Sequence, residues 1–547
     1  MARGDSSLQH LGDFTATRRM LTIAAFALPI GAFSAGVAWA LLRLIGLITN
    51  LVFYQRWGTA LVAPGAAPHP PALILLAPAA GGLAIGLIAR FGSEKVRGHG
   101  IPEAIESILV SGSRVQPRVA LLKPLASAIA IGTGGPFGAE GPIIMTGGAF
   151  GSLSAQLLHL TADERKTLLV AGAAAGMAAT FNAPLASVLL AIELLLFEWR
   201  PRSFVPVVAA VAVATAVRVP LLGAGPVFPA PAGPLHFDAA IYGLCVASGI
   251  VAGLLALLAT TLVYASEECF QRLPIHWMWW PAIGGLVVGL GGLVVPQALG
   301  VGYNVIEAEL NGTIALNLII GILIVKTLIW SLSLGSGTSG GVLAPMLMIG
   351  GALGGLEASV FPAVGPGFWA LVAMAGVLGG VMRSPLTGVA FALELTHRYE
   401  ALLPLLIGAT AAYVVSVLLL RRSVLTEKIA RRGLHLSREY SVDPLEVLFV
   451  HEVMSEGGPS GGAPEGPFVH DDDTLRHVAY AMASSGRTTM PVVDRRDPGR
   501  RLGTVTLEQL LQARLRDLQE ERHSERVLRP FSLIGIRRDG AKEKVVG

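Results

Sequence analysis

Glu140 has the surroundings of a residue with a chemical role, because it is an ionisable side chain inside the Gly-rich stretch Gly138-Ala139-Glu140-Gly141-Pro142. A carboxylate at membrane depth is costly unless it is paired or neutral, and by default it marks an ion or proton pathway. When the carboxylate is ionised, it can occupy an anion site in place of a free anion. When it is protonated, it can leave the site, and a free anion can bind there. One residue could therefore gate anions and carry protons; the alternative is a glutamate paired with an arginine.

The Gly-rich segment around Glu140 occurs twice. Residues 132–151 and 335–354 are identical at nine of twenty positions, at an offset of 203. A Gly-rich approach to a helix leaves backbone N–H groups free, and the positive end of the helix dipole favours an anion. Paired, interrupted apolar segments in two halves of a membrane protein point to a substrate site between them. The alternative is that the glycines only allow close helix packing.

Glu140 itself is not part of the repeat, because the second copy has Leu343 at its position. Symmetric packing therefore does not explain the carboxylate. A second repeated pattern starts at Pro184 and recurs at Pro385, now at an offset of 201, and it includes Glu193 and Glu394. Because these two glutamates occur in both copies, we expect them to hold the scaffold together and not to move ions.

The elements that must position these residues are membrane helices. The chain has 547 residues, of which 53% are hydrophobic and 14% charged, and its mean hydropathy is +0.62. An ordinary soluble enzyme would carry about a quarter charged residues, so that class is excluded. Residues 21–420 contain 33 of the charged side chains and residues 421–547 contain 40. The sequence therefore predicts one apolar body followed by a hydrophilic C-terminal part.

Several apolar stretches are long enough for a membrane span of about 20 residues. Examples are Leu21 to Phe53, Ala72 to Phe91, Ile241 to Tyr264, Ile314 to Leu332 and Leu402 to Leu420. The first is too long for the core of a signal peptide, so no removed leader is expected. Basic residues flank the first and last spans, and the positive-inside rule therefore predicts that both termini are cytoplasmic. We expect an integral protein of the plasma or inner membrane.

Metal, redox and nucleic-acid chemistry have little support. Cys245 and Cys269 are too few for a disulfide scaffold or a thiolate metal site. The net charge of +4 comes mostly from the C-terminal part and membrane-flanking arginines, so it does not indicate a nucleic-acid partner. A Gly337-Thr338-Ser339-Gly340 string could suggest a membrane serine protease, but this needs an activating histidine, for which His99 is the only deep candidate. We therefore expect a transporter and not an enzyme.

Three Gly-rich segments, in chain order, resemble those of the CLC family of chloride channels and proton-coupled chloride exchangers. They are Gly98-His99-Gly100-Ile101-Pro102-Glu103, Gly138-Ala139-Glu140-Gly141-Pro142 and Gly341-Val342-Leu343-Ala344-Pro345. The resemblance covers about residues 20–435. It implies an all-α membrane domain over 21–435 with two inverted-topology halves of tilted and broken helices, at about 72–200 and 275–420, and one chloride and proton pathway in each subunit of a homodimer. No cofactor is implied for this domain.

The resemblance also implies roles for individual residues. Glu140 matches the external gating glutamate, and Glu198 is similar to the internal glutamate that passes protons in the exchangers; the alternative for Glu198 is a surface residue beside Arg200 and Arg202 at a helix end. Both carboxylates favour a proton-coupled exchanger over a passive voltage- or pH-gated channel. The implied anion-binding positions are His99, Gly100, Ile101, Gly138, Ala139, Gly141, Val342, Leu343 and Leu425.

Four positions depart from the family pattern. His99 stands where a serine is usual and Leu425 where a tyrosine is usual, so two hydroxyl groups are lost. An imidazole can act as a neutral donor or as a titrating cation, whereas leucine donates nothing. Ala139 and Leu343 replace a basic residue and a phenylalanine. Anion preference and the tightness of coupling are therefore open.

The C-terminal part, about 442–530, resembles a CBS module, a cytoplasmic nucleotide-sensing α+β domain. It has a helical run from Thr474 to Ser484, strand-like segments at 490–494 and 502–506, and a helical run from 507 to 525. Only one complete motif fits. Gln509 stands where the family has its ribose-contacting acidic residue, so adenosine nucleotide binding is disfavoured and a dimer-stabilising role is favoured. Residues 1–20 are expected to be a cytoplasmic segment and 531–547 a flexible tail.

Overall fold

The computed structural model describes residues 17–522, except 159, 232, 234, 434–442, 457–465 and 498. The chain forms two compact units, Phe14–Arg438 and a second unit that contains the chain from Glu439 onward. The expected N-terminal segment is described only from residue 17, and the expected tail at 531–547 lies outside the described residues.

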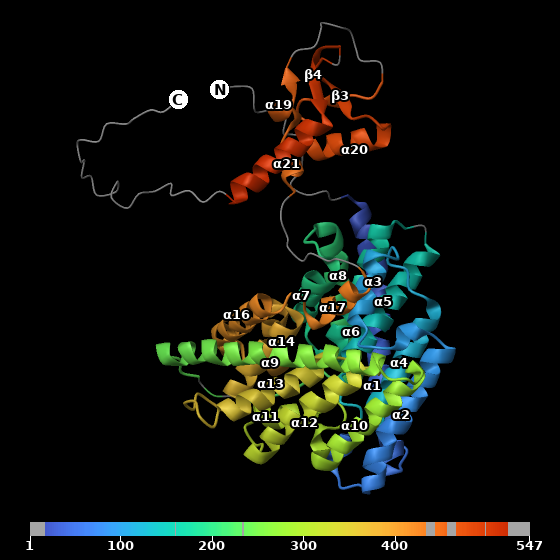
Figure 1. Cartoon of the computed structure of the whole chain (residues 1–547), viewed down its shortest axis with the longest axis vertical. Helices are drawn as coiled ribbons and strands as arrows, with labels where there is room; N and C mark the ends of the chain where they lie inside the picture. The colour runs from blue at the N-terminus through green and yellow to red at the C-terminus, as the bar shows by residue number, and fades with distance from the viewer. Residues whose placement is uncertain are drawn as a thin grey trace, which may run out of the picture. The chain divides into compact units, whose positions relative to one another are not determined.

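The first unit is helical throughout, and its helices form two successive sets of eight among the described residues (Figure 1). The first set is α1 (Arg19–Tyr54), α2 (Pro71–Phe91), α3 (Ile101–Leu109), α4 (Pro117–Gly132), α5 (Glu140–Leu157), α6 (Ala162–Phe181), α7 (Pro184–Leu190) and α8 (Pro201–Leu222). The second set is α9 (Ala239–Gln271), α10 (Trp280–Val294), α11 (Tyr303–Leu310), α12 (Leu316–Gly335), α13 (Leu343–Glu357), α14 (Phe368–Met382), α15 (Pro385–Thr396) and α16 (Leu402–Leu419). The short helix α17 (Val424–Arg431) follows.

The two sets correspond helix by helix. α5 and α13 start 203 residues apart, and α7 and α15 start 201 apart, as the repeated motifs predict. α1 packs on α8 as α9 packs on α16. The repeat is therefore longer than the halves expected at 72–200 and 275–420, because it begins with α1 and α9. These two helices carry none of the Gly and Pro motifs, so the sequence comparison could not align them.

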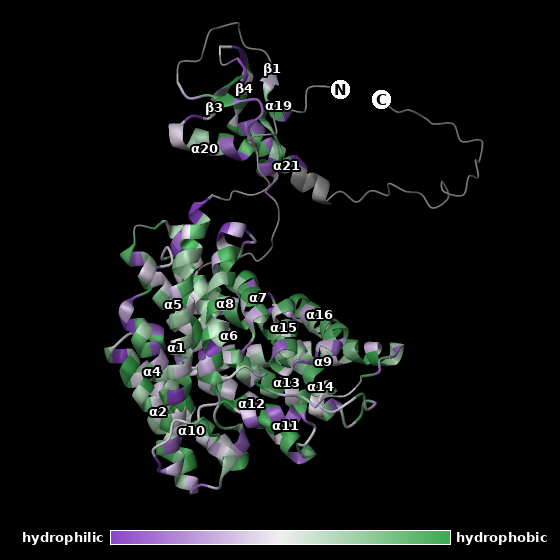
Figure 2. Cartoon of the chain, turned by 180° about the vertical axis from the view of Figure 1, so that it is seen from behind, coloured by the Kyte–Doolittle hydropathy of each residue, from purple (hydrophilic) through white to green (hydrophobic). Residues whose placement is uncertain are grey.

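Seven of the described helices are long and apolar enough to cross a membrane. They include the five apolar stretches singled out in the sequence, and Figure 2 shows hydrophobic residues along the helices of this unit. α5 is not among these seven, α3, α11 and α13 are shorter than any of them, and the first residues of α3, α5 and α13 are buried. Broken helices of this kind are tolerated at membrane depth where their ends are buried in protein or line a cavity.

Two partly buried glutamates, one from each half, cap the paired helices α7 and α15. Glu394 in α15 accepts hydrogen bonds from the backbone N–H groups of Leu185 and Ala186, at 2.9 and 2.8 Å, at the start of α7. Glu193 accepts the N–H of Thr387 at 3.0 Å, at the start of α15. The glutamate of each half thus caps the corresponding helix of the other half. They agree with the scaffold role expected from the sequence.

We expect Glu394→Ala to lower the free energy of unfolding by about 1–2 kcal/mol, the usual cost of losing a side-chain cap at a helix start. Thermal unfolding of the detergent-purified protein would measure the loss. Glu307→Ala, on the exposed side of α11, is the matched control. Equal unfolding midpoints for the two variants would contradict the capping role.

The second unit contains a four-stranded sheet with the strand order β1-β4-β3-β2. Its strands are β1 (Ser455–Glu456), β2 (Val469–His470), β3 (Thr489–Val493) and β4 (Arg501–Thr506), and its helices are α18 (Pro444–Val447), α19 (Val450–Val453), α20 (Leu475–Ser485) and α21 (Leu507–Arg522). β4 is antiparallel to β1 and β3, whereas β2 is parallel to β3. The helical and strand-like segments lie where the sequence predicts them.

Gln509 has a structural role at the start of α21. Its side-chain oxygen accepts the N–H of Thr506 at 2.8 Å, and its amide nitrogen donates to the hydroxyl of Ser455 at 2.8 Å. Both ends of the side chain are therefore engaged within the unit. The expectation that adenosine nucleotide binding is disfavoured stays a prediction.

Candidate functional site

The starts of α3, α5 and α13 meet at one point, through backbone contacts between their Gly-rich loops. Gly341 donates its N–H to the carbonyl of Gly138 at 2.9 Å, which joins the loop before α13 to the loop before α5. Gly98, before α3, donates to the carbonyl of Thr338 at 3.2 Å. Loops from both halves are thereby joined, and the three helix starts predicted to bind an anion are brought together.

Glycine is needed where α3 meets α5. A Cβ atom on Gly100, whose φ is +90°, would lie 2.6 Å from the carbonyl oxygen of Gly141. A Cβ atom on Gly141 would overlap the carbonyl oxygen of His99. The two helix starts can approach this closely only because neither glycine has a side chain. The predicted site residues Gly100 and Gly141 therefore act by allowing this approach.

The carboxylate of Glu140 lies at the centre of this junction. Glu140 is fully buried as the first residue of α5, and its Oε1 accepts the N–H of Leu343, the first residue of α13. A Cβ atom on Gly138 or on Gly341 would overlap the carboxylate. Within the described part of the chain, Oε2 has no hydrogen-bond partner. The carboxylate thus lies at the N-terminus of a helix from the other half, and helix N-termini favour negative charge.

The other predicted residues of the junction are also buried. Ala139 precedes α5, Ile101 is the first residue of α3, and Val342 precedes α13. Their side chains are apolar and 0%, 1% and 0% exposed, so at these three positions a ligand would meet the backbone and no side-chain charge. This is the arrangement that the repeated Gly-rich loops predict.

His99 connects the junction to a cavity of about 440 Å³. The imidazole is 4% exposed, and its Nδ1 has no hydrogen-bond partner among the described residues. The cavity is also lined by residues of α3, α9, α12 and the region around α17, including Glu103, Tyr264, Leu334 and Lys428. His99 therefore stands between the cavity and the three helix starts.

Two buried lysines, which the sequence analysis missed, hold the loops in place. Lys123 Nζ donates to the carbonyls of Val96 and Gly98, at 2.7 and 2.6 Å. Lys326 Nζ donates to the carbonyls of Ala298 and Gly300, at 2.9 and 2.8 Å. The two lysines are 203 residues apart, which is the offset of the Gly-rich loops, so extending the repeat comparison to charged residues would have found them.

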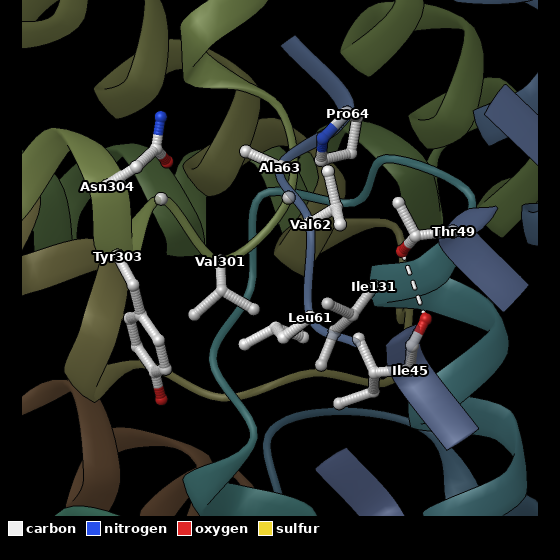
Figure 3. Close-up of a pocket in the computed structure, with 12 residues that line it drawn as sticks. Ile45, Thr49, Leu61, Val62, Ala63, Pro64, Ile131, Val301, Tyr303 and Asn304 are labelled. Carbon is white, nitrogen blue, oxygen red and sulfur yellow. Dashed lines mark hydrogen bonds between the residues drawn. The ribbon is translucent and has the colours of Figure 1, made fainter. Parts of the chain in front are cut away.

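A smaller cavity, of about 80 Å³, lies beside the equivalent loop of the second half (Figure 3). Gly300 and Gly302, which correspond to Gly98 and Gly100, line it together with residues of α1 and of the segment 61–64. Figure 3 shows the side chains of Val301 and Leu61 facing this space. The space is thus bordered mainly by apolar groups, in contrast to the polar cavity beside His99.

Comparison with known proteins identifies the family. The family model described as voltage gated chloride channel matches residues 81–417. The chain belongs to this family. The exchange transporter ClcA of Salmonella arizonae, described as an H(+)/Cl(-) exchanger, is 33% identical over 372 residues, which cover 63% of this chain and 75% of the relative. ClcA of a Salmonella paratyphi B strain is 32% identical over the same length.

Solved CLC structures share the fold. A slow cyanobacterial Cl⁻/H⁺ antiporter is 22% identical with a TM-score of 0.65, covering 76% of this chain and 99% of the antiporter. A eukaryotic CLC transporter is 19% identical with a TM-score of 0.63, covering 90% of this chain and 98% of the transporter. The predicted fold, two inverted halves of tilted and broken helices, is confirmed. The relatives named here are transporters, which agrees with the expectation of a transport protein.

Glu198, the predicted internal proton-transfer residue, lies in a cluster of cations outside this junction. Lys166, Arg200 and Arg202 are 3.7, 3.7 and 3.5 Å from its carboxylate. Although burial alone would raise it, the hydrogen bond from Ser203 and these three charges hold the pKa of Glu198 below its ordinary value. The contacts with Arg200 and Arg202 match the alternative interpretation of a helix-end residue. A proton-transfer role for Glu198 stays a prediction.

Leu425, at the position of the usual CLC tyrosine, is fully buried in α17. Lys428 of the same helix pairs with Glu103 in the first turn of α3 at 2.6 Å, which ties α17 to α3. Tyr264, which the sequence analysis missed, donates its hydroxyl to the carbonyl of Val424 and lines the cavity beside His99. α17 therefore presents an apolar residue where the CLC pattern has a phenol, while a phenol from α9 lies nearby.

Ser339 does not form the protease arrangement that was weighed above. Its hydroxyl is hydrogen-bonded to that of Ser127 at 2.7 Å. Both serines are fully buried, and the loop of Ser339 is paired through its backbone with Gly98. The serine therefore joins the two halves of the CLC fold.

Proposed function

We propose that this protein is a proton-coupled chloride exchanger in which Glu140 is both the gate and a proton carrier. The observation that carries the proposal is the position of the Glu140 carboxylate, which accepts the N–H of Leu343 at the start of α13. The ionised side chain there takes the place of an anion. Protonation removes its charge, so the carboxyl group can leave and a chloride ion can take the same amide donors.

Chloride as the substrate is supported by the relatives. The ClcA proteins, 32–33% identical to this chain, are described as H(+)/Cl(-) exchange transporters. Electrically neutral amides suit this substrate, because they replace water around the ion without a full positive charge that would trap it. Leu425 and the paired state of Glu198 favour a second candidate, a passive chloride channel of the same fold.

Uphill proton movement separates the two candidates. The full chain would be reconstituted into liposomes loaded with chloride at equal pH on both sides, and external pH would be recorded when chloride is allowed to leave. An exchanger takes protons into the liposomes as chloride leaves, so the external pH rises and the protons move against the gradient that this uptake creates. Chloride efflux without accompanying proton movement would overturn the exchanger and establish the channel.

The assembly and orientation are also part of the proposal. We infer a homodimer in a cell membrane, with both termini in the cytoplasm and the CBS-like unit stabilising the dimer. The support is the family resemblance together with the basic residues around the first and last spans. These residues are Arg3, Arg18, Arg19, Arg421, Arg422, Lys428, Arg431 and Arg432.

His99 is expected to set the anion preference. His99→Ser replaces a bulky imidazole by a compact hydroxyl donor, so we expect chloride to be favoured over nitrate about fivefold more than in the natural chain, equivalent to one net hydrogen bond of about 1 kcal/mol. Reversal potentials measured in chloride, nitrate and fluoride would show the change. Unchanged selectivity would contradict a role for His99 in the anion path.

A further inference from the structure

Tyr303 carries a phenol that the mechanism above does not use. It is the first residue of α11 and follows Gly302, whose φ is +85°. Figure 3 shows its ring at the edge of the cavity of about 80 Å³. Its counterpart in the first half is Ile101, the first residue of α3. The phenol therefore belongs to one half only, as the carboxylate of Glu140 does.

The hydroxyl of Tyr303 is buried and has no hydrogen-bond partner in the described part of the chain. A phenol can donate one hydrogen bond and accept others, and burying it without any is unfavourable. Because the oxygen atom is out of reach of solvent, water does not take the place of a protein partner. The hydroxyl is therefore available to a side chain that moves toward it.

Two phenylalanines restrict the ring of Tyr303. The ring centroid of Phe181, in α6, lies 6.4 Å away, and that of Phe228 lies 5.4 Å away. Both contacts are edge to face, at interplanar angles of 66° and 75°. The hydroxyl is thus held in one place, and a partner has to come to it.

Glu140 is the side chain placed to do so. The phenol interacts electrostatically with the Glu140 carboxylate. Gly302, the residue before Tyr303, packs on the first turns of α13, since a Cβ atom there would lie 2.5 Å from the sulfur of Met348. The start of the same helix holds the Glu140 carboxylate. Its Oε2 atom, like the phenol oxygen, has no hydrogen-bond partner among the described residues.

We propose that Tyr303 is a positioning residue for the gate, whose hydroxyl donates a hydrogen bond to the carboxyl group of Glu140 once that group has left the N–H of Leu343. The inference rests on the proposed gating role of Glu140. The movement would pair two buried groups that are otherwise unpaired. It would also give the displaced side chain a defined position while an anion uses the amide donors at the start of α13.

Infrared difference spectra recorded between acidic and alkaline pH test this contact without transport. In the full, detergent-purified chain, the carbonyl stretch of protonated Glu140 is the band that disappears in Glu140→Gln. A carbonyl that accepts a hydrogen bond absorbs at lower frequency than a free one. We therefore expect Tyr303→Phe, which keeps the ring and loses only the hydroxyl, to shift this band to higher frequency.

Tyr242→Phe is the matched control, because it removes the same atom from a tyrosine near the start of α9, whose ring packs on Phe237 at 5.9 Å. It should leave the Glu140 band in place. Tyr303→Phe removes an oxygen atom that makes no hydrogen bond in this conformation, so we expect its unfolding midpoint to be no lower than that of the natural chain.

Transport in liposomes gives a second measurement. We expect Tyr303→Phe to slow proton and chloride exchange about fivefold, the equivalent of one net hydrogen bond, and Tyr242→Phe to leave both fluxes within about twofold. A Glu140 band at the same frequency in Tyr303→Phe and in the natural chain would overturn the inference. A band that shifts in a protein that moves no protons would overturn the exchanger proposal and leave the contact between Tyr303 and Glu140 standing.

Discussion

Glu140→Gln is expected to reduce chloride-driven proton transport at least 100-fold while chloride flux continues. Glutamine has the shape of the protonated side chain but cannot carry a proton, and it has no charge with which to compete for the N–H of Leu343. The gate should therefore stay available to chloride, and the coupling should be lost. Proton and chloride fluxes measured together in liposomes would show the separation.

The control for this experiment is Glu307→Gln, the same chemical change at an exposed position of α11. It should leave both fluxes within twofold of the natural chain. A second variant, Glu198→Gln, tests the source of the protons. It should lose proton transport only if Glu198 supplies protons to Glu140. Proton transport that persists in Glu140→Gln would contradict the proposed role of this residue.

Lys123→Met and Lys326→Met are expected to be the most destabilising substitutions in the membrane unit. Each lysine is fully buried and donates to two loop carbonyls. Methionine fills the space but donates nothing, so each variant leaves two carbonyls unsatisfied, at about 1–3 kcal/mol each. We therefore expect a loss of about 2–6 kcal/mol in the free energy of unfolding.

Thermal unfolding in detergent would measure this loss, with Arg118→Met, at an exposed position of α4, as the control. In the Lys123 variant, chloride uptake should also fall further than the amount of folded protein does, because Lys123 holds Gly98, the residue before His99, in position. If either lysine variant unfolded at the same temperature as the control, the proposed support of the loops would be wrong.

Local sequence signals were sufficient to predict where these helices begin and that Glu140 lies at one of the helix starts. A helix that begins after a Gly-rich loop and carries a Pro in its first turn is specified by residues next to one another, as at the starts of α3, α5 and α13. The offset of 203 residues then relates the two halves. The correspondence of α1 with α9 was missed, because lipid-facing helices need only be apolar and many sequences satisfy that requirement.

Contacts between distant segments could not be predicted from the sequence. Lys428 pairs with Glu103 across 325 positions, and Arg97 is placed between Trp277 and Gly337 only when the two halves come together. Glu198 illustrates the same limit, since its motif suggests proton transfer but its neighbour Lys166 is known only from the fold.

The amino-acid order by itself determined that this chain is a membrane protein of two related halves, and that Glu140 has no counterpart in the second half, since hydropathy, helix starts and internal repetition are properties of short segments. Only the tertiary structure decided that the carboxylate of Glu140 takes its hydrogen bond from the other half, and that Arg97, His99 and Trp280 share one cavity. The physical reason is that an ion site at membrane depth is built from backbone amides and side chains whose mutual distances depend on packing across the whole fold.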